Sequence, residues 1–263
     1  MEGIASKISR NRFSLWLYER GLARQVGQLS LPKHIGIIMD GNRRWAESKG
    51  LEKYLGHVFG AKKVEEVLKW CYDLGINTVT LYVFSTENLK RPYEEVELIF
   101  RLFKDKLIEV MSKGVLHESR TRLKVIGRRE LIPTEIMQCI ERVEKETESY
   151  SSHYLNIAFA YGGRAEIVDA VKSIAQEISE GSLKPNDIDE ETISKRLYTA
   201  HLPEPDPDLI IRTSGEERLS NFLLWQSAYS ELVFIDVYWP EFRRIDLLRA
   251  IRIYQKRKRR FGV

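Results

Sequence analysis

Short apolar segments rich in β-branched residues alternate with helical patterns along this chain, and this alternation restricts its fold more than any other feature. The segments span residues 34–39, 78–85, 122–126, 154–160, 209–212 and 233–238. Several are apolar nearly throughout, which is typical of strands covered on both faces. Between them, apolar residues recur with helical spacing, most clearly over residues 64–74 and 167–178. The pattern predicts a single α/β domain with a central, mostly parallel six-stranded sheet flanked by helices.

Composition is compatible with such a domain and narrows the partners. With 263 residues, 43% of them hydrophobic, the chain is long enough to bury a full core. Its formal charge of +4 is too close to balance to require nucleic acid, but it suits anionic small-molecule substrates. Cys71 and Cys139 lack the spacing of a disulfide framework or a zinc site, so we expect reduced thiols.

Residues 1–33 precede the first predicted strand and are expected to form an N-terminal arm, and residues 34–263 are expected to form one domain that carries the site. The arm contains an aromatic and apolar run, residues 13–18, which suits packing on the domain or a partner subunit and, as the less favoured alternative, contact with a membrane surface. We find neither a signal peptide nor a stretch long enough to span a membrane. We therefore expect a cytoplasmic protein, with peripheral membrane association left open.

Polar residues follow the first predicted strand directly, in the order Asp40, Gly41, Asn42, Arg43, Arg44 and Trp45. Open α/β sheets bind ligands at the carboxyl ends of their strands. Guanidinium groups grip phosphate oxygens in a fork, and a carboxylate beside bound phosphate is a usual place for magnesium. Taken alone, this motif could equally be a solvated turn.

Two later strand ends carry similar chemistry. The first holds Ser85, Thr86, Glu87, Asn88 and Arg91, where Ser85 or Thr86 could also cap a helix. The second holds Arg212, Arg218 and Ser220, followed eleven residues later by Glu231. These arginines could instead form surface salt bridges. Three basic, hydroxyl-rich strand ends in one sheet nevertheless predict a cleft for two diphosphates, with Asp40 and Glu231 available for a metal ion.

Five ordered blocks over residues 34–262 resemble the cis-prenyltransferases, the family of undecaprenyl diphosphate synthases and related archaeal and eukaryotic polyprenyl synthases. They read HIGIIMDGNRRWA, GH at Gly56-His57, FSTEN followed by RP, NIAFAYGGR and IRTSGEERLSNFLLWQSAYSEL. The resemblance implies a homodimer with a hydrophobic tunnel beside a parallel sheet. It also implies a transferase that adds isopentenyl diphosphate sequentially, in cis, to an allylic diphosphate.

The resemblance also implies residue roles. Asp40 is the expected metal and catalytic aspartate, and Asn88 occupies a position proposed to assist proton removal, although a neutral amide is a poor base. Glu231 is the expected second metal-linked carboxylate, near the dimer contact, and the C-terminal residues 260–262 are expected to reach a neighbouring subunit. The expected substrate-binding residues are Gly41, Asn42, Arg43, Arg44, Trp45, Lys53, His57, Ser85, Thr86, Glu87, Arg91, Arg212, Arg218 and Ser220.

Three positions depart from the bacterial pattern. Lys53 replaces an arginine, Leu89 a tryptophan and Glu217 a histidine, so Lys53 would act as a point charge and Glu217 is not expected to bind metal. The NRR sequence after Gly41 and the Leu89 exchange favour an archaeal or eukaryotic type of enzyme and a longer primer. We expect a Mg2+-dependent polycis-polyprenyl diphosphate synthase that extends farnesyl or geranylgeranyl diphosphate and makes the precursor of a glycosyl carrier lipid. The alternative is a non-catalytic partner subunit of the same fold.

Overall fold

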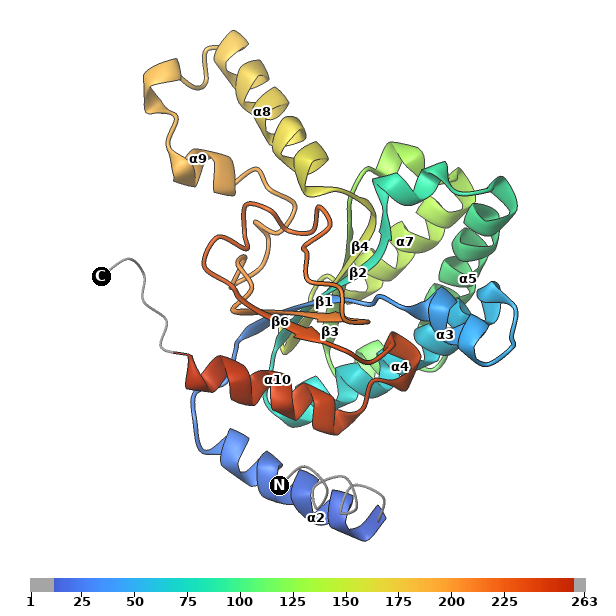
Figure 1. Ribbon diagram of the computed structural model, residues 1–263. Coiled ribbons are helices and arrows are strands. Elements are labelled where there is room, and N and C mark those ends of the chain that lie inside the picture. The colour runs from blue at the N-terminus through green and yellow to red at the C-terminus, as the bar shows by residue number, and fades with distance from the viewer. Residues whose placement is uncertain (1–11, 258–263) are drawn as a thin grey trace.

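A six-stranded parallel sheet forms the centre of the computed structural model, which describes residues 12–257 (Figure 1). The strand order is β3-β4-β2-β1-β5-β6, and every neighbouring pair is parallel. The strands are β1 (His34–Ile38), β2 (Thr78–Ser85), β3 (Thr121–Ile126), β4 (His153–Tyr161), β5 (Leu209–Thr213) and β6 (Glu231–Ile235). The prediction of an α/β domain with a parallel sheet is therefore confirmed.

Helices form most of the connections between these strands, as is usual for parallel pairing, whereas the long connection from β5 to β6, which the structure describes in full, contains none. The α-helices are α2 (Arg12–Gly27), α3 (Asn42–Ser48), α4 (Lys53–Asp73), α5 (Tyr93–Ser112), α6 (Val115–Glu118), α7 (Thr134–Thr147), α8 (Gly163–Ser179), α9 (Glu190–Ser194) and α10 (Arg244–Lys256). Short 3-10 helices are η1 (Thr86–Lys90), η2 (Arg129–Leu131), η3 (Pro185–Asp187) and η4 (Trp239–Glu241).

The two faces of the sheet are covered differently. Alternate strand residues, such as Ile35 and Ile37, join a large core with α4, α5, α7 and α10. The opposite face carries Ile38 and is covered by Phe222 and Leu223, which belong to the long connection between β5 and β6. Gly36 permits this covering, because a Cβ there would lie 3.0 Å from the Phe222 ring. Burial on both faces explains why the strand sequences are apolar almost throughout.

The strand order changes direction at β1. Strands β2, β4 and β3 lie on one side of β1, and β5 and β6 lie on the other side. Ligands of open α/β sheets bind at such a switch point, outside the carboxyl ends of the strands. The fold therefore directs attention to the residues that follow β1, β2 and β5.

The N-terminal helix α2 lies alongside α10, below the sheet in Figure 1. Leu22 and Val26 are buried in the main core, and Arg244 of α10 forms an ion pair with Glu19 at 3.1 Å. The outer side of α2 exposes Trp16, and its neighbours Leu17 and Tyr18 are equally exposed. The expected packing of the arm on the domain is therefore seen for the inner face of α2. Contact of the outer face of α2 with a membrane stays a prediction.

Four predicted strands begin and end within one residue of the observed boundaries and one matches them, whereas the last strand differs more. The sequence pattern placed the last strand at residues 233–238, but β6 begins at Glu231 and ends at Ile235. Beyond Ile235 the backbone leaves the ladder, and the Val237 carbonyl accepts a hydrogen bond from Ser214 N in the loop after β5.

No helix among the described residues is long and apolar enough to cross a membrane.

Candidate functional site

A polar pocket of about 450 Å3 opens at the carboxyl ends of β1, β2 and β5, where the fold predicts a ligand. Its lining brings together residues from all three sequence motifs. Lining residues that were predicted from sequence are Asp40, Gly41, Asn42, Arg43, Arg44, His57, Ser85, Asn88, Arg91, Arg212 and Ser220. The strand-end argument thus located a real cleft that contains four arginines.

Asp40 is held by donors from two sides of the pocket. Arg212 Nη2 donates to Asp40 Oδ2 at 2.7 Å, while Gly41 N and Arg44 Nη2 donate to Oδ1 at 2.6 and 3.4 Å. Burial by itself raises the pKa of Asp40, but the hydrogen bond and charge of Arg212, with Gly41 N and Arg44, outweigh burial and lower the pKa overall. The carboxyl group is therefore ionised at neutral pH.

Arg212 is the most buried of the four arginines. Besides Asp40, its guanidinium donates through Nη1 to Ser220 Oγ at 2.7 Å and to the carbonyl of Arg218. The guanidinium group of Arg212 therefore links Asp40, at the end of β1, to Ser220 in the loop after β5. Ser220 has a left-handed backbone at φ 49°, so this loop keeps an unusual conformation beside the guanidinium.

Two acidic residues that the motifs did not single out organise the remaining arginines. Glu95 of α5 pairs with Arg91 at 3.0 Å and with Arg43 at 3.4 Å, so arginines from two motifs share one carboxylate. On the other side, Glu216 pairs with Arg44 and Arg218 at 3.1 and 2.6 Å. The four-residue spacing from Arg91, just before α5, to Glu95 in the first turn of α5 is a signal that could have been found. The contact of Arg44 with Glu216 had no such signal.

The second motif forms a helix cap, one of the two readings that its sequence allowed. Asn88 N donates to Ser85 Oγ and Ser85 N donates to Asn88 Oδ1, both at 3.2 Å, at the start of η1. The amide of Asn88 is thus oriented at the pocket wall. Glu87 lies outside the lining and accepts a hydrogen bond from Asn221 Nδ2 at 2.8 Å.

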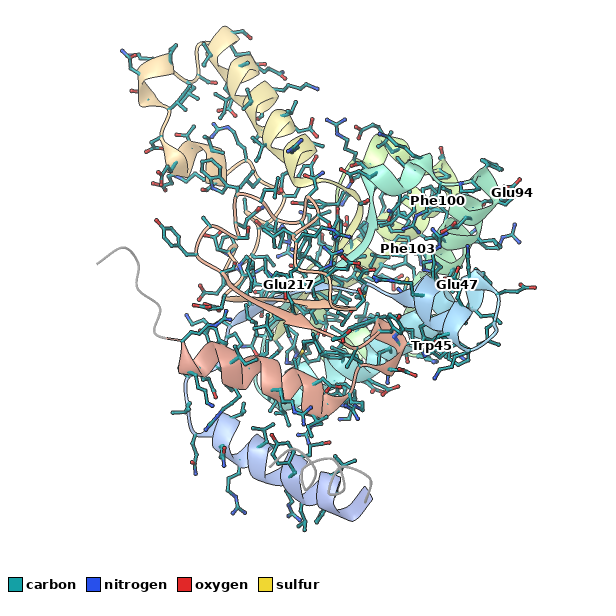
Figure 2. The ribbon with its side chains drawn as sticks, in the orientation of Figure 1. Trp45, Glu47, Glu94, Phe100, Phe103 and Glu217 are labelled. Atoms are coloured by element: carbon teal, nitrogen blue, oxygen red, sulfur yellow. The ribbon has the colours of Figure 1, made fainter. Side chains whose placement is uncertain are left out.

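Several predicted site residues lie away from the pocket lining. Trp45, on α3 beside Glu47 (Figure 2), is buried against Phe59 of α4, with ring centroids 5.0 Å apart. Lys53 lies outside the lining but pairs at 3.1 Å with Glu47, which does line the pocket. Thr86 and Arg218 also lie outside it.

Glu231 lies at the opposite edge of the sheet from Asp40. It opens β6 and stands in register with Leu209, which pairs with Ile35 at the amino end of β1. Five residues along a strand separate that level from Asp40, about 17 Å. Glu231 pairs instead with Arg257 at 2.8 Å. The fold therefore does not bring the two predicted metal carboxylates together within one chain.

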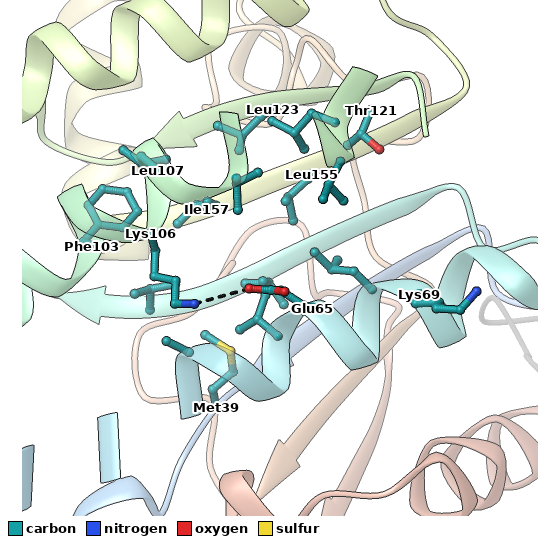
Figure 3. A pocket seen from close by; sticks show the side chains of 18 of the residues that line it. Met39, Glu65, Lys69, Phe103, Lys106, Leu107, Thr121, Leu123, Leu155 and Ile157 are labelled. Carbon is teal, nitrogen blue, oxygen red and sulfur yellow. Dashed lines mark hydrogen bonds and ion pairs between the residues drawn. The ribbon is translucent and has the colours of Figure 1, made fainter. Parts of the chain in front are cut away.

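An apolar pocket of about 420 Å3 adjoins the polar one and runs over the face of the sheet between α4 and α5 (Figure 3). Met39, Asn42, His57, Val83 and Ile99 line both pockets, so the two spaces meet at these residues. Farther along, Phe103 and Leu107 of α5 form part of the wall. Leu81 of β2, Leu123 of β3 and Leu155 of β4 line the pocket from the side of the sheet. The pocket reaches Thr121 and His153 at the amino edge of the sheet.

His57 marks the junction of the two pockets. Burial, together with the charges of Arg91 and Arg43, lowers the pKa of His57 to about 4, so the ring is neutral at pH 7. Its Nε2 is buried and, among the described residues, has no hydrogen-bond partner. Asn42 Oδ1 is in the same situation nearby. Polar atoms buried without partners are costly, which makes this junction a suitable place for a ligand's polar group.

The sequence and structure resemble known prenyl diphosphate enzymes. Residues 38–262 match the family model described as putative undecaprenyl diphosphate synthase. A tritrans,polycis-undecaprenyl-diphosphate synthase (geranylgeranyl-diphosphate specific) of Methanocaldococcus jannaschii is 55% identical over 94% of this chain and 89% of its own length. An isoprenyl transferase of Thermus thermophilus is 53% identical over 94% and 95%. The crystal structure of lavandulyl diphosphate synthase from Lavandula x intermedia with dimethylallyl diphosphate superposes with a TM-score of 0.86, at 35% identity over 89% of this chain and 99% of that one.

Proposed function

The chain belongs to the undecaprenyl diphosphate synthase family of cis-prenyltransferases, and from this premise we propose that it extends geranylgeranyl diphosphate with isopentenyl diphosphate to a long polycis product. The observation that carries the proposal is the junction of an arginine-lined pocket with an apolar one. A prenyl diphosphate has the same division, with an anionic head and a hydrocarbon chain. Names of relatives that specify geranylgeranyl diphosphate favour this primer over farnesyl diphosphate.

The arginines account for diphosphate binding. Arg43 and Arg91, whose charges act on His57, suit the allylic diphosphate, and Arg44 in the same polar pocket adds a third guanidinium group. Arg212 and Ser220 on the other side suit isopentenyl diphosphate, with Arg218 on the adjacent exposed loop. In this arrangement the hydrocarbon of the primer enters the apolar pocket past His57. Each methylene that leaves water stabilises the bound chain by about 0.8 kcal/mol.

In the proposed reaction the isopentenyl double bond attacks the allylic C1. The C1–O bond breaks and releases diphosphate, a new carbon–carbon bond forms, and the isopentenyl C2 loses a proton as the cis double bond forms. Fixed arginines stabilise the charge on the departing diphosphate, which is the main electrostatic task of such a site. Asn88 is held by its cap to Ser85 and is suited to orient a phosphate oxygen or water that accepts the proton.

Mg2+ fits the donors at the polar pocket. The ion commonly uses one or two carboxylates together with substrate phosphates and water, and Asp40 supplies one ionised carboxylate beside the arginines. When bound, Mg2+ would neutralise charge on the leaving diphosphate. Because Glu231 lies at the far edge of the sheet, we propose that it joins a metal site only from a second copy of the chain.

A homodimer is part of this proposal. The face of α8 that exposes Val168 and Val171 is a candidate contact, and the C-terminal residues 260–262, expected to reach a neighbouring site, lie outside the described residues. Light scattering after size exclusion, on the full chain and on Val171→Glu, tests the dimer. A monomeric wild type would contradict it.

Peripheral membrane contact is proposed for α2, where Trp16 and Leu17 are each about half exposed. Co-sedimentation of the full chain with anionic vesicles tests it, with the Trp16→Ala and Leu17→Ala double variant as comparison. Equal co-sedimentation of both proteins would contradict a role for this helix.

The decisive experiment incubates the purified full chain with labelled isopentenyl diphosphate, Mg2+ and, separately, geranyl, farnesyl or geranylgeranyl diphosphate. We expect polycis products, with the highest rate from geranylgeranyl diphosphate. A folded protein that yields no product with any primer would overturn the proposal and favour the non-catalytic partner subunit. A higher rate with farnesyl diphosphate would overturn the primer assignment alone.

A further inference from the structure

Four charged side chains form a closed ring of ion pairs between α4 and α5. Glu65 of α4 contacts Lys106 of α5 at 3.3 Å and Lys113, which caps the C-terminus of α5, at 3.9 Å, and these two lysines contact Glu109 of α5 at 2.6 and 2.5 Å. We call this group the α4–α5 clasp. Figure 3 shows the link between Lys106 and Glu65 across the gap that separates the two helices.

The clasp lies on the wall of the apolar pocket. Glu65, Lys106 and Lys113 all line the pocket, together with apolar side chains such as Leu68 and Leu107. The Lys106 side chain is only 21% exposed, so its hydrocarbon stem covers apolar surface while its ammonium group reaches the two glutamates. A hydrocarbon chain in the pocket would therefore pass beneath the clasp.

The clasp is far enough from the polar pocket to affect late rather than early steps. Glu65 follows His57 by eight residues on α4, a separation of about 12 Å along the helix axis. Condensation takes place on the polar side of His57 in the proposed function. The first addition to a primer therefore depends on the arginines, whereas the distal end of a lengthening chain comes to depend on the space between α4 and α5.

We propose that the α4–α5 clasp is a determinant of product length, and this inference rests on the proposed function. By holding the two helices together it limits the space available to the distal end of the chain. Single exposed ion pairs contribute little, but here four charges share one ring that joins two helices. Opposite charges at the surface are screened by salt, so the restraint weakens at high ionic strength.

The test compares product length and early rate in the full chain and in Glu65→Gln, Lys106→Met and the double variant. Lys104→Met is the matched control, because Lys104 also lies on α5 and pairs across to another helix, with Glu135 of α7 at 2.9 Å, yet does not line the pocket. Products are resolved by chain length, and the rate of the first condensation is measured in the same samples. Thermal unfolding verifies that each variant is folded.

We expect Glu65→Gln and Lys106→Met each to lengthen the mean product by at least one isoprene unit, with the first condensation within about twofold of wild type. The double variant should resemble the single variants, because both changes open the same ring, and Lys104→Met should match wild type. If both single variants give products of wild-type length, or if Lys104→Met lengthens the product equally, the proposed role of the clasp in product length is overturned. A wild type without any product would instead overturn the proposed function.

Discussion

Replacement of Arg212 by lysine is the sharpest test of the polar pocket. The arginine is 4% exposed and binds Asp40, Ser220 and the Arg218 carbonyl with one planar group. Lysine retains the positive charge but lacks the fork, so it cannot satisfy acceptors on both sides at once. The substitution thus separates the geometry of the arginine from its charge.

The expected loss follows from the contacts that disappear. A hydrogen bond to a charged group contributes about 1.5–3 kcal/mol. If the lysine retains the ion pair with Asp40, the contacts with Ser220 and the Arg218 carbonyl are lost, and water at the open pocket replaces part of these hydrogen bonds. A net loss of about 3 kcal/mol corresponds to a decrease of about 160-fold in kcat/KM.

The assay measures kcat and KM for each substrate with the other saturating. Because Arg212 and Ser220 are assigned to isopentenyl diphosphate, its KM should rise much more than that of the primer. Arg244→Lys is the control, since Arg244 pairs with Glu19 of α2 at 3.1 Å, outside the polar pocket. If Arg212→Lys keeps kcat/KM within threefold of wild type, or the control loses as much activity, the assignment is refuted.

Three further predictions concern packing, pH and metal. Gly56→Ala would place a Cβ 2.0 Å from the backbone oxygen of Asn42, so urea titration should show that the free energy of unfolding falls by about 1–3 kcal/mol. At Gly21 a Cβ would meet nothing within 4 Å, so Gly21→Ala should raise the free energy of unfolding by about 0.5–1 kcal/mol. Burial lowers the pKa of His34 to about 4, so the unfolded chain binds more protons between pH 6.5 and 4, and stability should fall by up to about 3 kcal/mol as pH decreases through that window. The wild-type urea midpoint should therefore depend on pH more steeply than that of His34→Gln; equal slopes would contradict the assignment. Removal of divalent metal should abolish turnover without lowering the Tm by more than a few degrees, and added Mg2+ should restore it.

Much of the fold could be predicted because both faces of the sheet are buried. Strands such as β2 and β5 consist mostly of apolar and β-branched residues and stand out between helices with a 3.6-residue period. The last strand was placed two residues late because β6 begins with a charged residue, Glu231, and because apolar Val237 and Tyr238 continue past its end. Tertiary contacts set that boundary, since Val237 bonds to the loop after β5.

The site was predictable only as far as the sheet determines it. Parallel strands place their carboxyl ends at one edge, and this rule alone brings Asp40, Ser85 and Arg212 to one pocket. Which side chains point into that pocket depends on short helices and loops. Trp45 therefore turned into the contact between α3 and α4, and the role of Glu216 was missed, because neither orientation follows from sequence spacing.

The junction of the two pockets explains how one surface can serve an anionic head and a hydrocarbon chain. Gly60 lets α4 approach α3 so closely that a Cβ there would lie 2.2 Å from Asn42 Oδ1. This approach buries His57 between the arginines and the apolar wall, and burial keeps its ring neutral at pH 7. A protonated imidazole at this point would add a charge that a passing hydrocarbon could not solvate. A neutral ring instead offers one hydrogen-bonding atom toward the diphosphate and an apolar face toward the chain, so the boundary between the pockets coincides with the boundary within the proposed substrate.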